Sequence, residues 1–286
     1  MPSLLDIRRR IRSVKNTQQL TKAMKTVSAA KLRRAQERVM AARPYADQLK
    51  KVLADVSATV ENIQHPLLEV RPEERVLLVV VTADRGLCGA FNSNLIKSAV
   101  QFLKDHGGKK LSLYTVGRKG RDFFKRRANE IIGEYVNFFT RLDYGHGRDI
   151  AQQLVDLYTK SEVDAVYIIY NEFKSVIQQR VVVEKLLPLG AAEPGVTDAG
   201  QMRREYIYEQ PPQEIFNRML PRYVEIQVYR ALLESAASEH GARMAAMDSA
   251  TRNAGELVDS LTLNMNRVRQ AAITREIIEV VSGAGV

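Results

Sequence analysis

The residues that come nearest to a chemical motif lie in two glycine-containing turns. Thr82-Ala-Asp-Arg-Gly-Leu-Cys-Gly89 follows an apolar run, where nucleotide-binding folds place a phosphate loop, and Gly117-Arg-Lys-Gly120 follows a second such run. Neither matches G-x-G-x-x-G or G-x-x-x-x-G-K-[ST], the patterns that cradle phosphates with backbone N–H groups. The turns therefore favour tight strand-to-helix connections that need glycine torsions over a nucleotide site.

Catalytic and metal chemistry have little support in the remaining residues. Cys88 is the only cysteine, so an intrachain disulfide is excluded, and no histidine stands near it in sequence to activate a thiolate. We expect it to be a small buried side chain. The four histidines are far apart and lack metal-ligand spacing. We predict no catalytic residues, no bound metal and no cofactor.

The positive charge is concentrated at the N-terminus. The chain carries a net charge of +10, and residues 1–51 hold fourteen basic but only three acidic side chains. This charge indicates an acidic partner, which could be a nucleic acid, an anionic lipid or an acidic protein surface. Residues 1–43 contain no aromatic side chain for stacking on bases, and the cations share their segment with an apolar stripe. A protein partner is the favoured interpretation, and a basic coiled-coil nucleic-acid-binding protein is the alternative.

Long helices are expected at both ends of the chain. Glycine is absent from Leu4 to Ile63, and apolar residues recur at alternating spacings of three and four, with Leu20, Met24 and Val27 expected to carry the stripe between Asn16 and Lys31. A similar stripe, rich in Ala, Met and Thr, runs from Ile226 to Ala272. Such spacing is typical of a coiled-coil seam, so we predict that the two helices pair antiparallel. Pro44 is expected to bend or break the first helix, and Pro221 to open or kink the second.

The middle of the chain alternates between strand and helix patterns. Strands are expected at Val76–Val81, Leu111–Val116, Ala165–Tyr170 and Gln178–Leu186, the last antiparallel, and helices at Asn94–Lys104, Lys119–Arg127 and Ile150–Thr159. This order predicts an α/β fold with a mostly parallel, Rossmann-like sheet. We expect three parts: an N-terminal shaft helix at 1–64, a central α/β domain at 65–211 and a C-terminal shaft helix at 212–286. No apolar run approaches the ~20 residues that cross a bilayer.

Several segments resemble one known family, the gamma subunits of bacterial F-type ATP synthases. The resemblance begins in the first helix, continues in Thr82–Gly89 and near residues 206–229, and ends in a highly specific C-terminal signature. The matching segments are Ile11-Arg-Ser-Val-Lys-Asn-Thr-Gln-Gln-Leu-Thr-Lys-Ala-Met24, Tyr206-Ile-Tyr-Glu-Gln-Pro211, Arg222-Tyr-Val-Glu-Ile-Gln-Val-Tyr229 and Arg269-Gln-Ala-Ala-Ile-Thr-Arg-Glu-Ile-Ile-Glu-Val-Val-Ser-Gly-Ala284. The match runs from end to end, in family order.

The resemblance implies a function that the patterns alone do not supply. It implies a non-catalytic, single-copy rotor shaft that transmits torque between the proton-driven membrane c-ring and a ring of three alpha and three beta subunits. It places the chain peripherally on the cytoplasmic side of the cell inner membrane, with the epsilon subunit as a further partner. By similarity, the beta-subunit catch region would contact Met24, Arg269, Gln270 and Thr274. The c-ring and epsilon foot would contain Tyr206, Tyr208 and Glu209.

Overall fold

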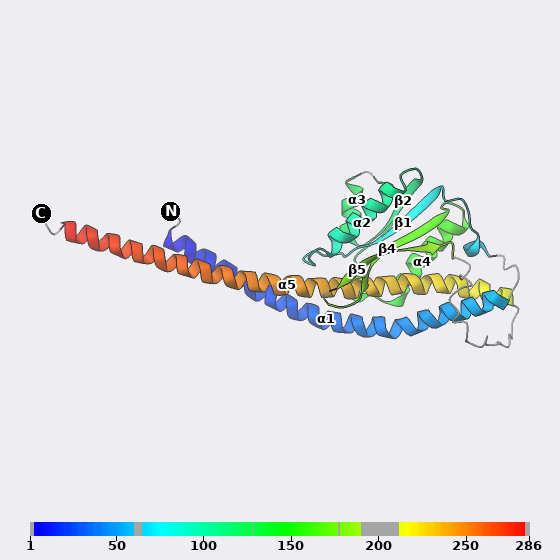
Figure 1. Ribbon diagram of the computed structural model, residues 1–286, viewed down its shortest axis with the longest axis horizontal. Helices are drawn as coiled ribbons and strands as arrows, with labels where there is room; N and C mark the ends of the chain where they lie inside the picture. The colour runs from blue at the N-terminus through cyan, green and yellow to red at the C-terminus, as the bar shows by residue number, and fades with distance from the viewer. Residues whose placement is uncertain (1–2, 60–64, 128, 177, 190–211, 284–286) are drawn as a thin grey trace. The chain divides into compact units, whose positions relative to one another are not determined.

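Two long helices and a central five-stranded sheet make up the chain (Figure 1). The computed structural model describes residues 3–59, 65–127, 129–176, 178–189 and 212–283. Helix α1 spans Leu4–Thr59 and helix α5 spans Pro212–Gly283. Ser3 begins α1, because its Oγ accepts a hydrogen bond from the backbone N–H of Asp6 at 3.2 Å while the Asp6 carboxylate accepts one from the Ser3 N–H. The expected long terminal helices are confirmed.

The sheet has the strand order β3-β2-β1-β4-β5, in which only β5 runs antiparallel to its neighbour. The strands are β1 (Arg75–Val81), β2 (Lys110–Val116), β3 (Ile131–Tyr135), β4 (Ala165–Phe173) and β5 (Gln179–Leu187). The helices between them are α2 (Phe91–Asp105), α3 (Arg118–Lys125) and α4 (Tyr144–Thr159), with short 3-10 turns at Pro66–Leu68 and Phe139–Arg141. The mostly parallel α/β fold and the antiparallel last strand are thus confirmed.

Strand β3 was not expected from the sequence. It contains only five residues, and Gly133 interrupts its apolar run. It lies at the edge of the sheet, so its side chains alternate between half-buried and exposed rather than forming the continuous apolar run of a central strand. Pairing with β2 stabilises this strand, and a local pattern does not report such pairing.

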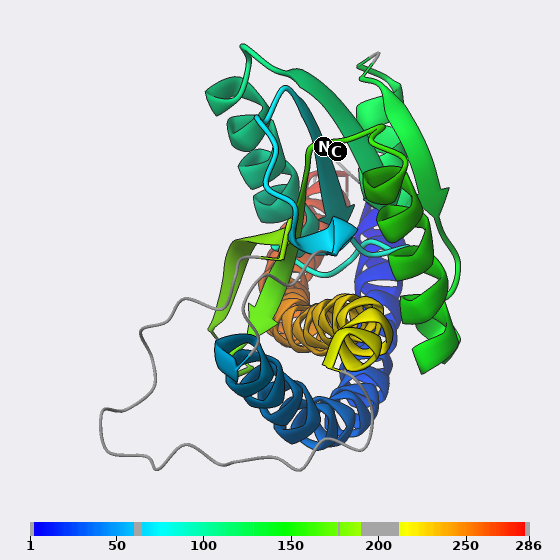
Figure 2. The same ribbon diagram turned by 90° about the vertical axis from the view of Figure 1, so that its right-hand side faces the viewer.

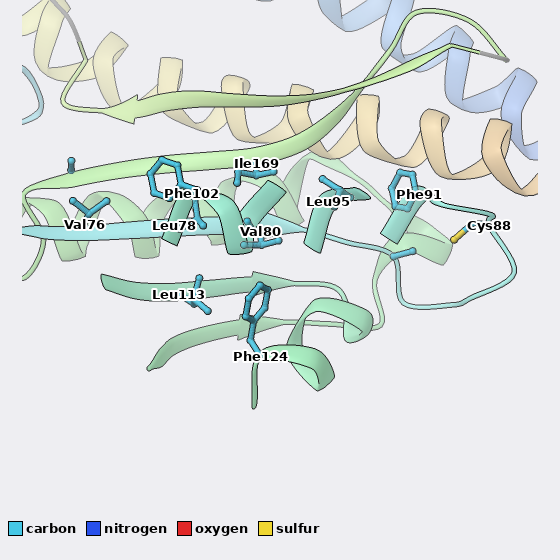
Figure 3. Close-up of a cluster of buried hydrophobic side chains, with 13 residues drawn as sticks. Val76, Leu78, Val80, Cys88, Phe91, Leu95, Phe102, Leu113, Phe124 and Ile169 are labelled. Atoms are coloured by element: carbon cyan, nitrogen blue, oxygen red, sulfur yellow. The ribbon is translucent and has the colours of Figure 1, made fainter. Parts of the chain in front are cut away.

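The core lies on both faces of the sheet. On one face Val76, Leu78 and Val80 of β1 pack with Leu95 of α2 and Phe124 of α3 (Figure 3). The alternate residues of β1 are equally buried and point to the opposite face, as the two-residue period of a strand requires. Figures 1 and 2 show α4 and α5 on that second face. The sheet is therefore covered on both sides, which explains the continuous apolar sequence of β1.

The chain divides into two compact units, and both long helices contribute to each. The shaft unit comprises Met1–Ala30 and Arg243–Val286, and the sheet unit comprises Lys31–Ala242. In the shaft unit, pairs between the helices join residues 25 and 248, 21 and 251, and 18 and 255. As the number in α1 falls, the number in α5 rises, so the helices are antiparallel. The three-part division into 1–64, 65–211 and 212–286 stays a prediction.

One stretch of the expected seam is wrong. The side chains of Leu20 and Val27 are 61 % and 55 % exposed, whereas Thr21 and Ser28 are buried against the paired helix. Both buried hydroxyls lie within hydrogen-bond distance of a carbonyl oxygen of their own helix, which lowers the cost of burying them. The seam on α5 matches the expectation better, because every residue of its predicted stripe is buried or half-buried. These residues are Ile226, Arg230, Leu233, Ala237, His240, Met244, Met247, Thr251, Ala254, Val258, Leu261, Met265, Val268 and Ala272.

Both prolines lie inside continuous helices. Helix α1 is continuous through Pro44, so the expected local break is absent. Helix α5 begins at Pro212, nine residues before Pro221, which lies inside it. Packing over many turns offsets the one lost backbone hydrogen bond at each proline, which costs ~3 kcal/mol in an isolated helix.

Candidate functional site

The turn after β1 is closed by its own polar groups. Thr82 donates from Oγ1 to the carbonyl oxygen of Val116 at 3.1 Å and accepts from the backbone N–H of Gly120 at 2.8 Å. The Asp84 carboxylate accepts from the backbone N–H groups of Arg118 and Asn137. These bonds join the turn to α3 and to the segment after β3. The backbone N–H groups of Arg118 and Gly120, which could otherwise meet a phosphate, are thus already hydrogen-bonded within the fold.

The glycines of these turns have steric roles. Gly117 has a φ of +89°, and a Cβ at this position would overlap the carbonyl oxygen of Thr82. A Cβ at Gly120 would lie 2.9 Å from Thr82 Oγ1, closer than real Cβ contacts. The interpretation of Gly117–Gly120 as a tight turn that requires glycine is therefore confirmed. In the first turn Gly89 has a φ of +56°, but a Cβ at Gly86 would make only ordinary contact. Among the described residues, no group of three or more potential metal ligands is clustered.

Cys88 is a buried core residue, as expected. It packs beside Phe91 in the cluster on the α2 face of the sheet (Figure 3). The Asn92 side chain donates from Nδ2 to its sulfur at 3.1 Å, while Asn92 Oδ1 accepts from the backbone N–H of Ala83 at 3.0 Å. The thiol therefore helps to fix the beginning of α2.

The shaft unit is held by a polar ladder as well as by apolar contacts. Lys25 Nζ lies 2.6 Å from Asp248 Oδ1, and the hydroxyl oxygens of Thr21 and Thr251 lie 2.8 Å apart. The hydrogen bond from Lys25 lowers the pKa of the Asp248 carboxyl below its usual value. Since this ion pair is about 40 % exposed, its contribution to stability is small. The ion pair instead contributes to specificity, because it sets the register between the two helices.

The proposed beta-contact residues do not form one cluster. Met24 is half-buried and adjoins the residues that pair with Asp248 and Thr251. Arg269 stands eighteen residues beyond Thr251 on α5, which corresponds to ~27 Å of helix. Arg269, Gln270 and Thr274 share about one and a half turns and are all exposed, and the Thr274 hydroxyl donates to the Gln270 carbonyl at 3.0 Å. The residues expected to contact the beta subunits thus lie at two levels along the shaft unit.

Beyond these residues α5 is uncovered. Every residue from Ile273 to Gly283 is exposed, including five large apolar side chains. They are Ile273, Ile277, Ile278, Val280 and Val281. A contiguous apolar surface of this kind marks an interaction site on a soluble protein. The cations of α1 are also exposed in this unit, at Arg8, Arg9, Arg10, Arg12, Lys15 and Lys22. The other expected contact residues, Tyr206, Tyr208 and Glu209, lie outside the described residues.

The sheet unit contains a polar contact that no sequence pattern singled out. Glu234 of α5 is 1 % exposed and binds Arg43 of α1 through Oε1, at 2.9 Å from Nε and 2.8 Å from Nη2. The backbone N–H of Phe173 donates to the other oxygen of Glu234 at 3.0 Å. The one available signal was a lone carboxylate within the small and apolar run from Ala231 to Ser238.

Known proteins share this sequence along its whole length. A family model described as ATP synthase matches residues 3–285. The ATP synthase gamma chain of Solibacter usitatus is 56 % identical over 99 % of both chains, and that of Pelotomaculum thermopropionicum is 50 % identical over 99 % of both. The chain belongs to the ATP synthase gamma chain family. The resemblance noted in the sequence segments is thereby confirmed.

Solved structures agree with this family assignment. A chain of the Tetrahymena thermophila mitochondrial ATP synthase central stalk and c-ring structure is 28 % identical, with a TM-score of 0.62 over 81 % of this gamma-family chain and 99 % of that one. A chain of the Euglena gracilis mitochondrial ATP synthase OSCP/F1/c-ring structure has a TM-score of 0.69 over 98 % and 92 % of the two chains. At 18 % identity, this second likeness shows the fold alone.

Proposed function

We propose that this chain is the central rotor stalk of a proton-translocating F-type ATP synthase. It transmits torque between the membrane c-ring and the catalytic hexamer of alpha and beta subunits, and it holds no catalytic residues of its own. Membership of the gamma chain family supports this role. The polar groups of the turn after β1 are engaged within the fold, which also favours a mechanical over a catalytic role.

The antiparallel pairing of the two chain ends carries the proposal. A shaft must resist twisting, and two paired helices with interlocked side chains are stiffer than either helix alone. The pairs Lys25–Asp248 and Thr21–Thr251 fix the register of this pairing. Beyond it α5 continues with an exposed apolar surface, which suits a bearing because apolar contact is non-directional.

The contact residues expected from the resemblance fit this arrangement. Met24 stands at one level of the shaft unit, and Arg269, Gln270 and Thr274 stand at another, where they meet the beta subunits. Exposed cations on α1 attract acidic loops through screened contacts that break and form again as the shaft turns. Each beta subunit responds only to differences between the faces of the shaft presented to it. Tyr206, Tyr208 and Glu209 form the foot that contacts the c-ring and the epsilon subunit.

The same role implies a peripheral place at the cytoplasmic side of the cell inner membrane, with one copy in each complex. None of the helices in the described part of the chain combines the length and the apolar character of a membrane span. The neighbours from Tetrahymena and Euglena come from structures described as containing a c-ring. Attachment through such a ring gives the chain a membrane association without a span of its own.

Assembly and rotation test the proposal directly. The chain is mixed with alpha and beta subunits of the same organism, and the mass of the product is measured. One copy per three alpha–beta pairs is expected, together with ATP-driven rotation of a bead attached to the chain. A chain that stays free, and that instead binds duplex DNA with a steep salt dependence, would favour the nucleic-acid alternative.

A further inference from the structure

Helix α5 becomes fully buried where it crosses the sheet. From Ala231 to Glu239 every residue is buried, so the helix is covered on all sides in this stretch. Figures 1 and 2 show the cause, since in the sheet unit α5 runs between the sheet and α1. Four polar residues lie in this covered stretch, namely Glu234, Ser235, Ser238 and Glu239. If this stretch of α5 were held by packing alone, apolar residues would be expected here, because burying polar groups is costly.

The buried carboxylate of Glu234 joins three elements. One oxygen accepts from Nε and Nη2 of Arg43 on α1, and the other accepts from the backbone N–H of Phe173, the last residue of β4. Arg43 Nη2 also lies 3.2 Å from the carbonyl oxygen of Phe173. The end of a central strand is thus held at both its N–H and its C=O by one ion pair, whose members come from the two shaft helices.

Further contacts fix the same face of α5 along the same strand. Ser238, one helical turn after Glu234, donates from Oγ to the carbonyl oxygen of Asn171 at 3.1 Å. Gly241 packs against the turn between β4 and β5, because a Cβ at this position would be in ordinary van der Waals contact with the Phe173 ring at 3.5 Å and the Val176 carbonyl oxygen at 3.6 Å. Glu234, Ser238 and Gly241 are spaced by four and three residues, so one stripe of α5 follows the end of β4.

Apolar contacts and hydrogen bonds differ in how strongly they resist rotation of α5 about its axis. Apolar surfaces packed together still permit a helix to turn about its axis, because their attraction has little direction. Hydrogen bonds weaken steeply with distance and angle. Turning α5 against the sheet would part Glu234 from Phe173 and leave a charged acceptor and a backbone donor buried without partners, which is strongly unfavourable.

We propose that the Arg43–Glu234 pair is a rotational lock, which holds the sheet in one orientation on α1 and α5 and carries torque between them. The inference rests on the proposed rotor function and deepens it. Arg43 and Glu234 are positioning residues, since they act by fixing the angle between two bodies. In this scheme, torque that reaches the sheet passes to both shaft helices at one point.

Torsional stiffness distinguishes a lock from a contact that only adds stability. The full chain is assembled with alpha and beta subunits, and a bead is attached at Lys125→Cys on α3, an exposed position. The angular variance of the bead is recorded while the complex waits for ATP. Glu234→Gln keeps the side-chain size and Arg43→Gln leaves a shorter polar side chain, and each removes the charge pair. We expect the variance to rise about two-fold in each, since a buried charged contact is lost.

Two controls distinguish the loss of the lock from a general increase in the flexibility of the protein. Glu37→Gln removes the exposed Arg33–Glu37 pair on the same helix α1 and should leave the variance unchanged. A bead attached at the exposed Asn217→Cys, on α5 itself, should show no change in any variant, because it reports on α5 and not on the sheet whose orientation the lock holds. An equal increase of the angular variance at both attachment points would show that the helices themselves had become more flexible, and it would overturn the proposal.

The two proposals also fail in different ways. If the unsubstituted complex rotates but the variance in Arg43→Gln and Glu234→Gln equals that of the unsubstituted complex, the lock is refuted and the rotor function stands. If the unsubstituted complex hydrolyses ATP without turning the bead at either point, the rotor function itself fails, and the lock fails with it. Melting curves of both variants, measured in the complex, confirm that the compared proteins are folded.

Discussion

Gly147 of α4 faces Tyr229 of α5 so closely that a methyl group on the glycine would lie 2.8 Å from the tyrosine Cβ. The contact continues one turn earlier, where the Tyr144 ring meets Tyr229 edge-on with 5.5 Å between centroids and the Tyr144 hydroxyl donates to Glu225 at 2.5 Å. Burial and this hydrogen bond raise the pKa of Tyr144 to about 12, so the donor keeps its proton at physiological pH. Helix α4 therefore seats α5 through a position that only glycine fits.

Replacing Gly147 should separate these two helices. Gly147→Ala is expected to lower the free energy of unfolding by about 1–3 kcal/mol, because overpacking outweighs the gain in helix propensity. The control is Gly283→Ala near the end of α5, where no atom lies within 4 Å of the new Cβ. That change should be neutral or stabilising. Urea unfolding followed by circular dichroism measures both, and equal effects would contradict the close contact.

The turn before α3 should be even less tolerant. Gly117→Ala places a Cβ on a residue with φ of +89° and against the Thr82 carbonyl. We expect a loss of about 3 kcal/mol or more, at the severe end of single substitutions. Gly108→Ala, where no atom lies within 4 Å of the new Cβ, is the matched control. A Gly117→Ala protein as stable as Gly108→Ala would show that the turn relaxes without cost.

Glu73 should make the fold acid-sensitive. Its carboxylate binds Lys109 Nζ and Lys185 Nζ, each at 2.7 Å, and accepts from the Tyr167 hydroxyl at 3.0 Å. These hydrogen bonds, the one from Lys109 above all, lower the pKa of Glu73 to about 2. A lowered folded-state pKa stabilises the protein above the unfolded value and loses this stabilisation as pH falls through the folded value.

The test compares Glu73→Gln with the unsubstituted chain over a pH series of urea unfolding. At pH 7 the variant should be less stable by about 1–2 kcal/mol, after allowance for screening of a partly exposed group. The difference should shrink below the pH at which an unfolded glutamate titrates and vanish near pH 2. Glu74→Gln, at the exposed neighbouring position, should show no such convergence. A constant difference at every pH would exclude the ion pairs as its source.

Substitution of Arg269 and Gln270 tests the proposed contact between this part of α5 and the beta subunits. Because both side chains are exposed, the double substitution Arg269→Ala with Gln270→Ala should leave assembly intact. Coupled ATP hydrolysis and proton pumping should weaken by less than about tenfold, the range expected for a few hydrogen bonds. Asn253→Ala, exposed on the same helix, serves as the control. Unchanged turnover and pumping in the double variant would remove these residues from the bearing.

Periodicity and composition determined most of the elements of this protein, although they missed the edge strand β3. Apolar spacing of three and four marked the terminal helices, and the β-branched run of β1 and the strands that follow marked a mostly parallel sheet. The charge count pointed to an acidic partner, and the segment from Arg269 identified the family. These features are local, because each depends on residues within a few turns or one strand, so a linear pattern records them.

Tertiary structure alone decided which side chains meet. Thr21 and Ser28 replaced Leu20 and Val27 in the seam because the paired helix sets the buried face, and their hydroxyls can bond to their own helix. Arg43, Phe173 and Glu234 come from three distant segments and converge only after α5 crosses the sheet. Met24 and Arg269 fall at different levels because the register of an antiparallel pair is a property of both helices. Such contacts depend on long-range packing, which leaves no period in the sequence.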